Sequence, residues 1–222
     1  MSSSVLIDAL LHKAFLPFFL GSLLSMLTIS NPVSKIPLFV SLTKAMAERE
    51  RKDVARQACI YGLAMLTVTL FFGGFILEVF GISFGALRVA GGLTVSVLGF
   101  RMLFGGGYVG PHAGALGGNI AVFPLALPGI SGPGAIAVVI GISTEIAELP
   151  TVFGKAIAYG ATVMSLFITC AAIWLTLRSA RAISRAIGPD AMEAITRIMG
   201  FLLVCIGVQF VGSGVRTFIG NL

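Results

Sequence analysis

Long apolar runs separated by short polar gaps dominate the chain. Six of the runs are long enough to cross a bilayer, which takes roughly 20 mostly apolar residues. The pattern therefore predicts an all-α integral membrane protein with six transmembrane helices, because a helix pairs its own backbone groups within the lipid. The expected spans cover residues 14–43, 57–79, 83–104, 119–143, 152–177 and 191–218.

The first and fourth runs are each interrupted by a similar short element. The copies are Asn31-Pro32-Val33-Ser34-Lys35-Ile36-Pro37 and Pro128-Gly129-Ile130-Ser131-Gly132-Pro133-Gly134. Because proline removes a backbone donor and clashes with the carbonyl four residues back, we expect helices 1 and 4 to be discontinuous here. Matched breaks in two half-chains are typical of the binding sites of secondary transporters.

The two half-chains carry their features in the same order. Each has a broken helix, a plain helix and a helix with an Arg-x2-Gly element, at Arg88 and at Arg197. Three spans per half place the second half in the opposite orientation. We therefore expect two inverted three-helix repeats, residues 1–110 and 111–222, within one membrane domain. Chance likeness between glycine- and proline-rich membrane helices is the alternative.

Glycines recur in the third and sixth spans with one spacing. Gly92 and Gly99 match Gly200 and Gly207. Small residues on one helix face let two helix backbones approach each other, so the spacing predicts close helix packing.

Basic residues gather in two of the polar gaps. The gap after the first span holds five of them and the gap after the fifth holds three, whereas the turn after the fourth span carries Glu145 and Glu148. With six spans the two basic gaps lie on one side. The positive-inside rule makes that side cytoplasmic and leaves both termini outside.

Composition agrees with a bilayer environment. Hydrophobic residues make up 57% and charged residues 11% of the chain, against about 25% charged in soluble domains. The net charge of +6 lies in the gaps and shows no basic and aromatic surface for nucleic acid. The three cysteines lie inside apolar runs without metal-ligand spacing, so we expect no metal and no cofactor. No oligomeric state follows from the sequence.

The two breaks together predict a small site for a zwitterionic solute. Freed carbonyls suit an ammonium group, and free amides at the restarted helices suit a carboxylate. Two proline kinks repaired by Ser and Thr hydroxyls are the alternative. The expected substrate-binding residues are Asn31, Pro32, Ser34, Pro37, Pro128, Gly129, Ser131, Gly132, Pro133 and Gly134.

Three basic residues have either a gating or an anchoring role. Lys35 lies inside the first break, where it is either a buried functional cation or a side chain that snorkels to the cytoplasmic surface. Arg88 and Arg197 lie about one turn inside helix ends, as interfacial anchors or as gate residues paired with an opposing acid. Since no carboxylate falls clearly at mid-membrane, the coupling ion, H+ or Na+, is left open.

Three motifs carry a family resemblance over nearly the whole chain. They are Asn31-Pro32-x4-Pro37-Leu38-Phe39, residues 86–92 and residues 124–136. With them the chain resembles the MarC family, also called the small neutral amino acid transporter (SnatA) family. The resemblance implies six helices in inverted repeats and transport of glycine, alanine or similar amino acids. Ser34 stands where the family usually has glycine, and Gly129 where it usually has an apolar residue.

The sequence thus predicts a secondary transporter of small neutral amino acids in the inner membrane and no enzyme. An exporter of amino acids or other small solutes uses the same features, because direction depends on gradients that the sequence does not encode. A membrane scaffold without a solute pathway is a further alternative. It requires side chains to fill the space around the proline breaks, with no water and no solute there.

Overall fold

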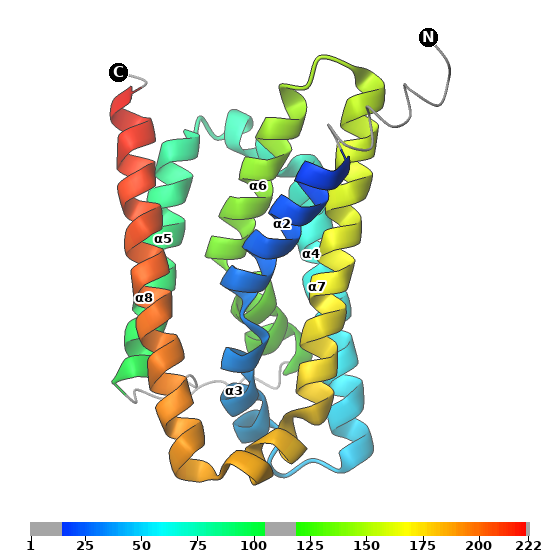
Figure 1. The fold of residues 1–222 in the computed structure, drawn as a ribbon, viewed down its shortest axis with the longest axis vertical. Helices are drawn as coiled ribbons and strands as arrows, with labels where there is room; N and C mark the ends of the chain where they lie inside the picture. Colours follow the sequence, from blue (N-terminus) through cyan, green and yellow to red (C-terminus); the bar gives the residue numbers. More distant parts are fainter. Residues whose placement is uncertain (1–14, 105–118, 221–222) are drawn as a thin grey trace.

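Helical segments lie side by side along the long axis of the molecule (Figure 1). The structure, a computed structural model, describes residues 15–104 and 119–220, and this described part is helical without a strand. Its elements are α2 (Leu16–Ser30), η2 (Pro32–Ser34), α3 (Lys35–Leu42), α4 (Glu48–Val79), α5 (Phe84–Leu103), η3 (Ala121–Ile130), α6 (Pro133–Ala147), α7 (Val152–Ile187) and α8 (Pro189–Gly220).

The predicted membrane fold is confirmed. Within the described residues five helical stretches are long and apolar enough to cross a bilayer, and the bent pair η3–α6 brings the number to six. Large apolar side chains such as Phe75, Phe167 and Phe201 are more than half exposed. An apolar surface of this kind, spread over several helices, is stable against lipid rather than water.

Both predicted helix breaks are present, but the first is shorter than expected. It covers residues 31–34, and Pro37 lies inside α3 rather than in the break. The prediction that the interruption extends to Pro37 is wrong because first-turn amides have no intrahelical acceptor, so proline is tolerated there. Pro133 likewise opens α6. In each element the first proline lies in the irregular segment and the second in the first turn of the next helix.

Two helices extend well beyond the apolar runs that predicted them. α4 begins at Glu48 rather than near residue 57, and α7 continues to Ile187 rather than ending near residue 177. The side chain of Glu50 accepts the Ala47 amide at 3.0 Å and so helps to cap the start of α4. Hydropathy marks the length in contact with lipid, whereas charged helix formers continue the helix into water.

The pair α5 and α8 has the most extensive helix packing in the molecule. Glycines meet glycines along the antiparallel interface: a methyl carbon placed on Gly92 would lie 2.5 Å from the carbonyl oxygen of Gly207, and one on Gly99 would lie 2.6 Å from that of Gly200. The predicted close packing is confirmed. Gly85 and Gly214, seven residues further along each helix, continue the seam.

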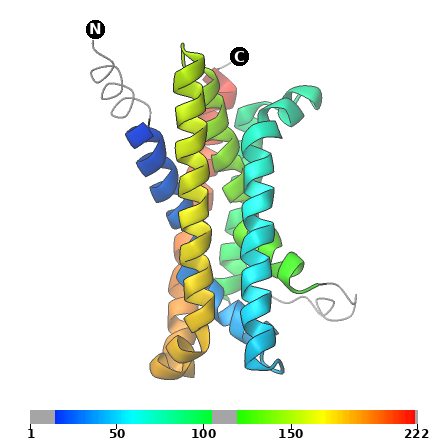
Figure 2. The same ribbon diagram turned by 90° about the vertical axis from the view of Figure 1, so that its right-hand side faces the viewer.

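The helices form two outer pairs with a central pair between them. α5 and α8 lie on one side, α4 and α7 on the other, and α2 and α6 between them (Figure 1). Figure 2 shows η3 (green) next to α4 (cyan), where Gly62 of α4 makes room for Ile130. The beginning of α2 and the end of α8 lie at one end of the molecule, and the two basic segments lie at the other.

Corresponding helices of the two halves run in opposite directions (Figure 1). This arrangement is consistent with inverted repeats, but any chain with three spans per half would share it, so the internal repeat stays a prediction. The expected boundary between residues 110 and 111 lies outside the described residues.

Candidate solute-binding site

The first break redirects one backbone carbonyl to a lysine. The Ser34 amide donates to the carbonyl oxygen of Asn31 at 3.2 Å, which leaves the carbonyl of Ser30 without the amide that a continuing α-helix would supply. The ammonium of Lys35 donates to this Ser30 oxygen instead. Asn31 has φ of 30°, a left-handed conformation that asparagine tolerates better than most residues. The break is therefore an ordered turn with a cation built into it.

The second break is made by extended backbone within a compact segment. Phe123 and Leu127 have φ near −130° and −117° with ψ of 123°, and the segments before and after the break are bent by 57°. A methyl carbon on Gly132 would lie 2.5 Å from the carbonyl oxygen of Pro128. Glycine is required at this position because the chain folds back on itself, which is a reason independent of any ligand.

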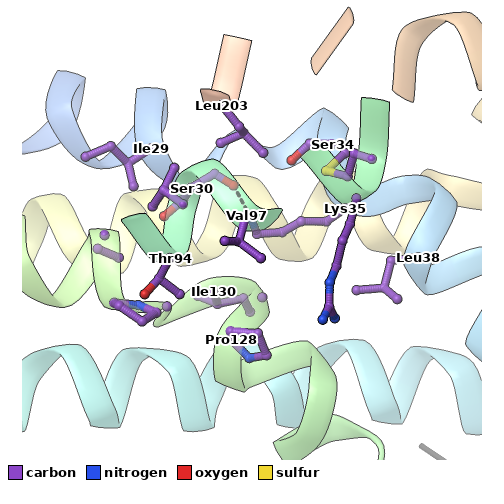
Figure 3. A pocket seen from close by; sticks show the side chains of 18 residues that line it. Ile29, Ser30, Ser34, Lys35, Leu38, Thr94, Val97, Pro128, Ile130 and Leu203 are labelled. Carbon is purple, nitrogen blue, oxygen red and sulfur yellow. Dashed lines mark hydrogen bonds between the residues drawn. The ribbon is translucent and has the colours of Figure 1, made fainter. Parts of the chain in front are cut away.

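One cavity lies between the two breaks. Its volume is about 250 Å³, and α5 and Leu203 of α8 complete its wall. Figure 3 shows Ser30 and Lys35, which flank the first break, together with Pro128 and Ile130 of the second. The two elements are nearly a hundred residues apart in the sequence, and helix packing brings them to one place.

Polar groups in this cavity are few and unbalanced in charge. Lys35 is buried, with 8% of its surface exposed, as the first of the two alternatives expects, and its functional role stays a prediction. Lys35 and Arg101 both line the cavity, and its lining includes no carboxylate among the described residues. The hydroxyl of Ser30 is buried and is the one buried side-chain oxygen or nitrogen in the described part of the chain without a hydrogen-bond partner.

Only some of the predicted substrate-binding residues reach the cavity. Ser34, Pro128, Gly129, Gly132, Pro133 and Gly134 line it. Pro32 and Pro37 are not among the lining residues.

Two of the predicted polar residues have other partners. The amide of Asn31 donates toward the sulfur of Met199 at 2.8 Å. The Ser131 hydroxyl, fully buried, donates to the carbonyl oxygen of Ala126 at 3.0 Å and lies 3.3 Å from the sulfur of Met65. Both side chains therefore hold the breaks in place.

The two arginines predicted as gates or anchors lie at opposite ends. Arg197 is paired with Glu193 of the same helix at 2.6 Å and is exposed. Arg88 stacks on the ring of Phe84 at 4.2 Å from its centroid and donates to Thr217 at 3.4 Å. In the described residues neither arginine pairs with an acid from an opposing helix.

Arg88 belongs to a second cavity, which has a volume of about 560 Å³. It extends from the centre toward the end where α2 begins, and Glu145 also lines it. Ile29 lines both this cavity and the one between the breaks. Across from it, a methyl carbon placed on Gly134 would lie 3.7 Å from Ile29 and 2.5 Å from the side chain of Val95. Ile29 thus lies between two hollows, one on the side of the basic segments and one on the side where α2 begins.

Sequence reasoning missed three polar residues of this cavity, besides the apolar ones that line it. Ser30 immediately precedes the first motif, and its position beside a helix break is the one signal that could have identified it. Thr94 and Arg101 come from α5, and only the packing of α5 against the breaks places them there.

Comparison with known proteins places the chain among inner membrane proteins. The model of the family described as MarC family integral membrane protein matches residues 16–219. The chain is 37% identical over 213 residues to the inner membrane protein MarC of Escherichia coli (strain K12), covering 89% of this chain and 93% of the relative. The protein of the same name from Shigella flexneri shows the same identity and coverage. No solved structure matches the chain.

Proposed function

The chain belongs to the MarC family of integral membrane proteins, and we propose that it is a secondary transporter of small neutral amino acids such as glycine and alanine. The observation that carries this proposal is that both helix breaks line one cavity. Broken helices at matching positions of two half-chains, meeting around one hollow, are the arrangement that many transporters use to bind a solute at mid-membrane.

The volume and the polar groups of the cavity suit a small zwitterion. Pockets for drug-sized ligands take about 300–1,000 Å³, and this one has about 250 Å³. Lys35 and Arg101 offer positive charge to a carboxylate, whereas the Ser30 hydroxyl and the irregular backbone at Pro128 offer oxygen atoms to an ammonium. Because no described lining residue has a carboxylate, the cavity favours a solute that itself carries a carboxylate group.

The two cavities on either side of Ile29 support alternating access. A transporter must expose its site to one side of the membrane at a time, and a thin apolar partition between two hollows needs a small movement to change sides. Ile29 lies two residues before the first break, so a tilt of α2 relative to α3 would move this partition.

We further propose that the end with the basic segments faces the cytoplasm, which places the beginning of α2 and the end of α8 outside. Single cysteines at Lys44 and at Gly81, in a variant lacking the native cysteines, test this orientation. An impermeant thiol reagent added to intact cells is expected to label the cysteine at position 81 and to spare that at position 44. The reverse labelling pattern contradicts the orientation.

An exporter would use the same site, and counterflow in both directions separates it from an importer. A scaffold without a solute pathway has less support, because it requires a dry and fully packed interior. An unpaired buried hydroxyl in a cavity costs free energy unless water or a solute binds it.

A thermal-shift panel on the purified protein tests the proposed substrate class. Glycine and alanine should raise the melting temperature, because a ligand that binds only the folded state stabilises it by mass action. Acetate, which lacks the ammonium, and methylamine, which lacks the carboxylate, should each act more weakly at the same concentration. Equal stabilisation by acetate and glycine would contradict zwitterion recognition, and no shift with any amino acid would favour the scaffold.

A further inference from the structure

A third cavity, the basic cavity, lies at the end of the molecule where α3 ends and α7 meets α8 (Figure 1). It has a volume of about 220 Å³ and lies between α3, α4 and α7. Five basic side chains and one carboxylate line it: Arg51, Lys52, Arg178, Arg181, Arg185 and Glu48. Two segments more than a hundred residues apart therefore place a strong excess of positive charge in one hollow.

The single carboxylate of the basic cavity does not neutralise its arginines. Glu48 lies 2.7 Å from the ammonium of Lys52, one turn further along α4, so its charge is already compensated. Within the ranges that the structure describes, none of the four lining arginines forms an ion pair. Arg178 lies 5.4 Å from the centroid of the Trp174 ring, and no other described aromatic ring stacks on these four arginines.

Arg51 is the clearest sign that this cavity is a site. Only 9% of its surface is exposed, and no carboxylate or other described acceptor holds its guanidinium. Exposed basic residues on the cytoplasmic face are ordinary, but Arg51 is about nine-tenths covered by protein and forms no ion pair with any described residue. An anion in the basic cavity would supply the charge partner that Arg51 lacks.

We propose that the basic cavity binds the phosphate group of an anionic phospholipid. The planar guanidinium matches phosphate oxygens with paired hydrogen bonds, and several arginines converge here. Phe39, Val40 and Leu177 line the same hollow. These apolar side chains suit the glycerol and the first acyl carbons of a lipid, whereas a free phosphate ion makes no use of them. Basic hollows between membrane helices are recognised sites for such headgroups.

The position of this site links it to the first helix break. Phe39, Val40 and Thr43 belong to or directly follow α3, which continues from the turn that contains Lys35. A bound headgroup would hold α3 against α4 and α7, and so would fix the lower half of the broken helix. The inference does not depend on transport, because the positions of the arginines and the burial of Arg51 are independent of the solute.

Ligand-dependent melting of the purified protein tests the site. The protein, in a neutral detergent without phosphate, is titrated with short-chain phosphatidylglycerol, with phosphatidylcholine of the same chain length and with inorganic phosphate. Phosphatidylglycerol should raise the melting temperature by a few degrees and phosphatidylcholine much less. Arg51→Gln should weaken the apparent affinity for phosphatidylglycerol about ten-fold, the value of a charge-assisted hydrogen bond.

Arg49→Gln is the matched control, because Arg49 is an exposed residue at the start of the same helix and does not line the basic cavity. Arg181→Gln carries the same prediction as Arg51→Gln if the latter does not fold. If inorganic phosphate stabilises the protein, phosphatidylglycerol does not, and both cavity variants lose the effect, the cavity binds phosphate but not a lipid. That result would overturn the proposed lipid ligand. Equal titrations of the wild-type, Arg51→Gln and Arg181→Gln proteins would overturn the site.

Discussion

At the scale of single residues, Ser30 distinguishes a binding site from a pair of structural kinks. Its buried hydroxyl has no partner among the described residues. Ser30→Ala should leave the free energy of unfolding unchanged or raise it by about 1 kcal/mol, because an unsatisfied polar group is removed. Glycine affinity, measured by isothermal titration, should fall about five- to ten-fold as one hydrogen bond is lost.

Ser213→Ala provides the control for this substitution. Ser213 lies on α8 outside the cavity, and its hydroxyl donates to the carbonyl oxygen of Phe210 at 3.0 Å. Glycine affinity should not change in this variant. If the Ser30→Ala protein binds glycine as tightly as the wild type, the Ser30 hydroxyl does not contact the solute.

The sequence predicted cavity residues correctly mainly where a residue shapes the backbone around it. Prolines and glycines such as Pro128 and Gly132 reveal a break because their effect is local, and both line the cavity. Asn31 and Ser131 share the motifs, yet they contact Met199 and Met65, methionines on other helices. Direction of a side chain within a break depends on its neighbours in space, which a local motif does not encode.

At the scale of helices, the glycine seam between α5 and α8 gives a sharp test of packing. Gly207→Ala should lower the free energy of unfolding by about 1–3 kcal/mol, because its methyl carbon would lie 2.6 Å from the carbonyl oxygen of Gly92. Gly212→Ala, on the same helix with open space around it, should be neutral or raise stability by up to about 1 kcal/mol. Reversible unfolding in mixed detergent measures both, and equal effects would contradict a glycine-dependent seam.

Helix positions were predictable where lipid sets them, and helix ends were not. The start of α7 at Val152 and each end of α5 agree with the apolar runs to within one residue. The sequence analysis did not predict that the charged first turns of α4 and last turns of α7 are helical. Charged residues are common both in loops and on helices in water, so their presence does not distinguish the two. Those same turns form the basic cavity, so hydropathy alone could not reveal it.

At the scale of the whole molecule, the three cavities already described follow one another along the described part of the bundle. One lies between the breaks, one extends from Ile29 toward the end where α2 begins, and the basic cavity lies at the opposite end. Both cavities at Ile29 border the seam of α5 with α8 and the broken helices. A rigid seam beside two interrupted helices would allow the latter to move against the former, as rocking-bundle transport requires.

Counterflow of labelled glycine in proteoliposomes is the most direct test of transport. Vesicles loaded with unlabelled glycine or alanine and containing the wild-type protein should accumulate labelled glycine transiently, well above protein-free vesicles, and those with Ser30→Ala should do so more slowly. Vesicles loaded with acetate should show little accumulation. A folded wild-type protein that gives the same uptake as protein-free vesicles, with every amino acid tested inside, would contradict a solute pathway through this cavity.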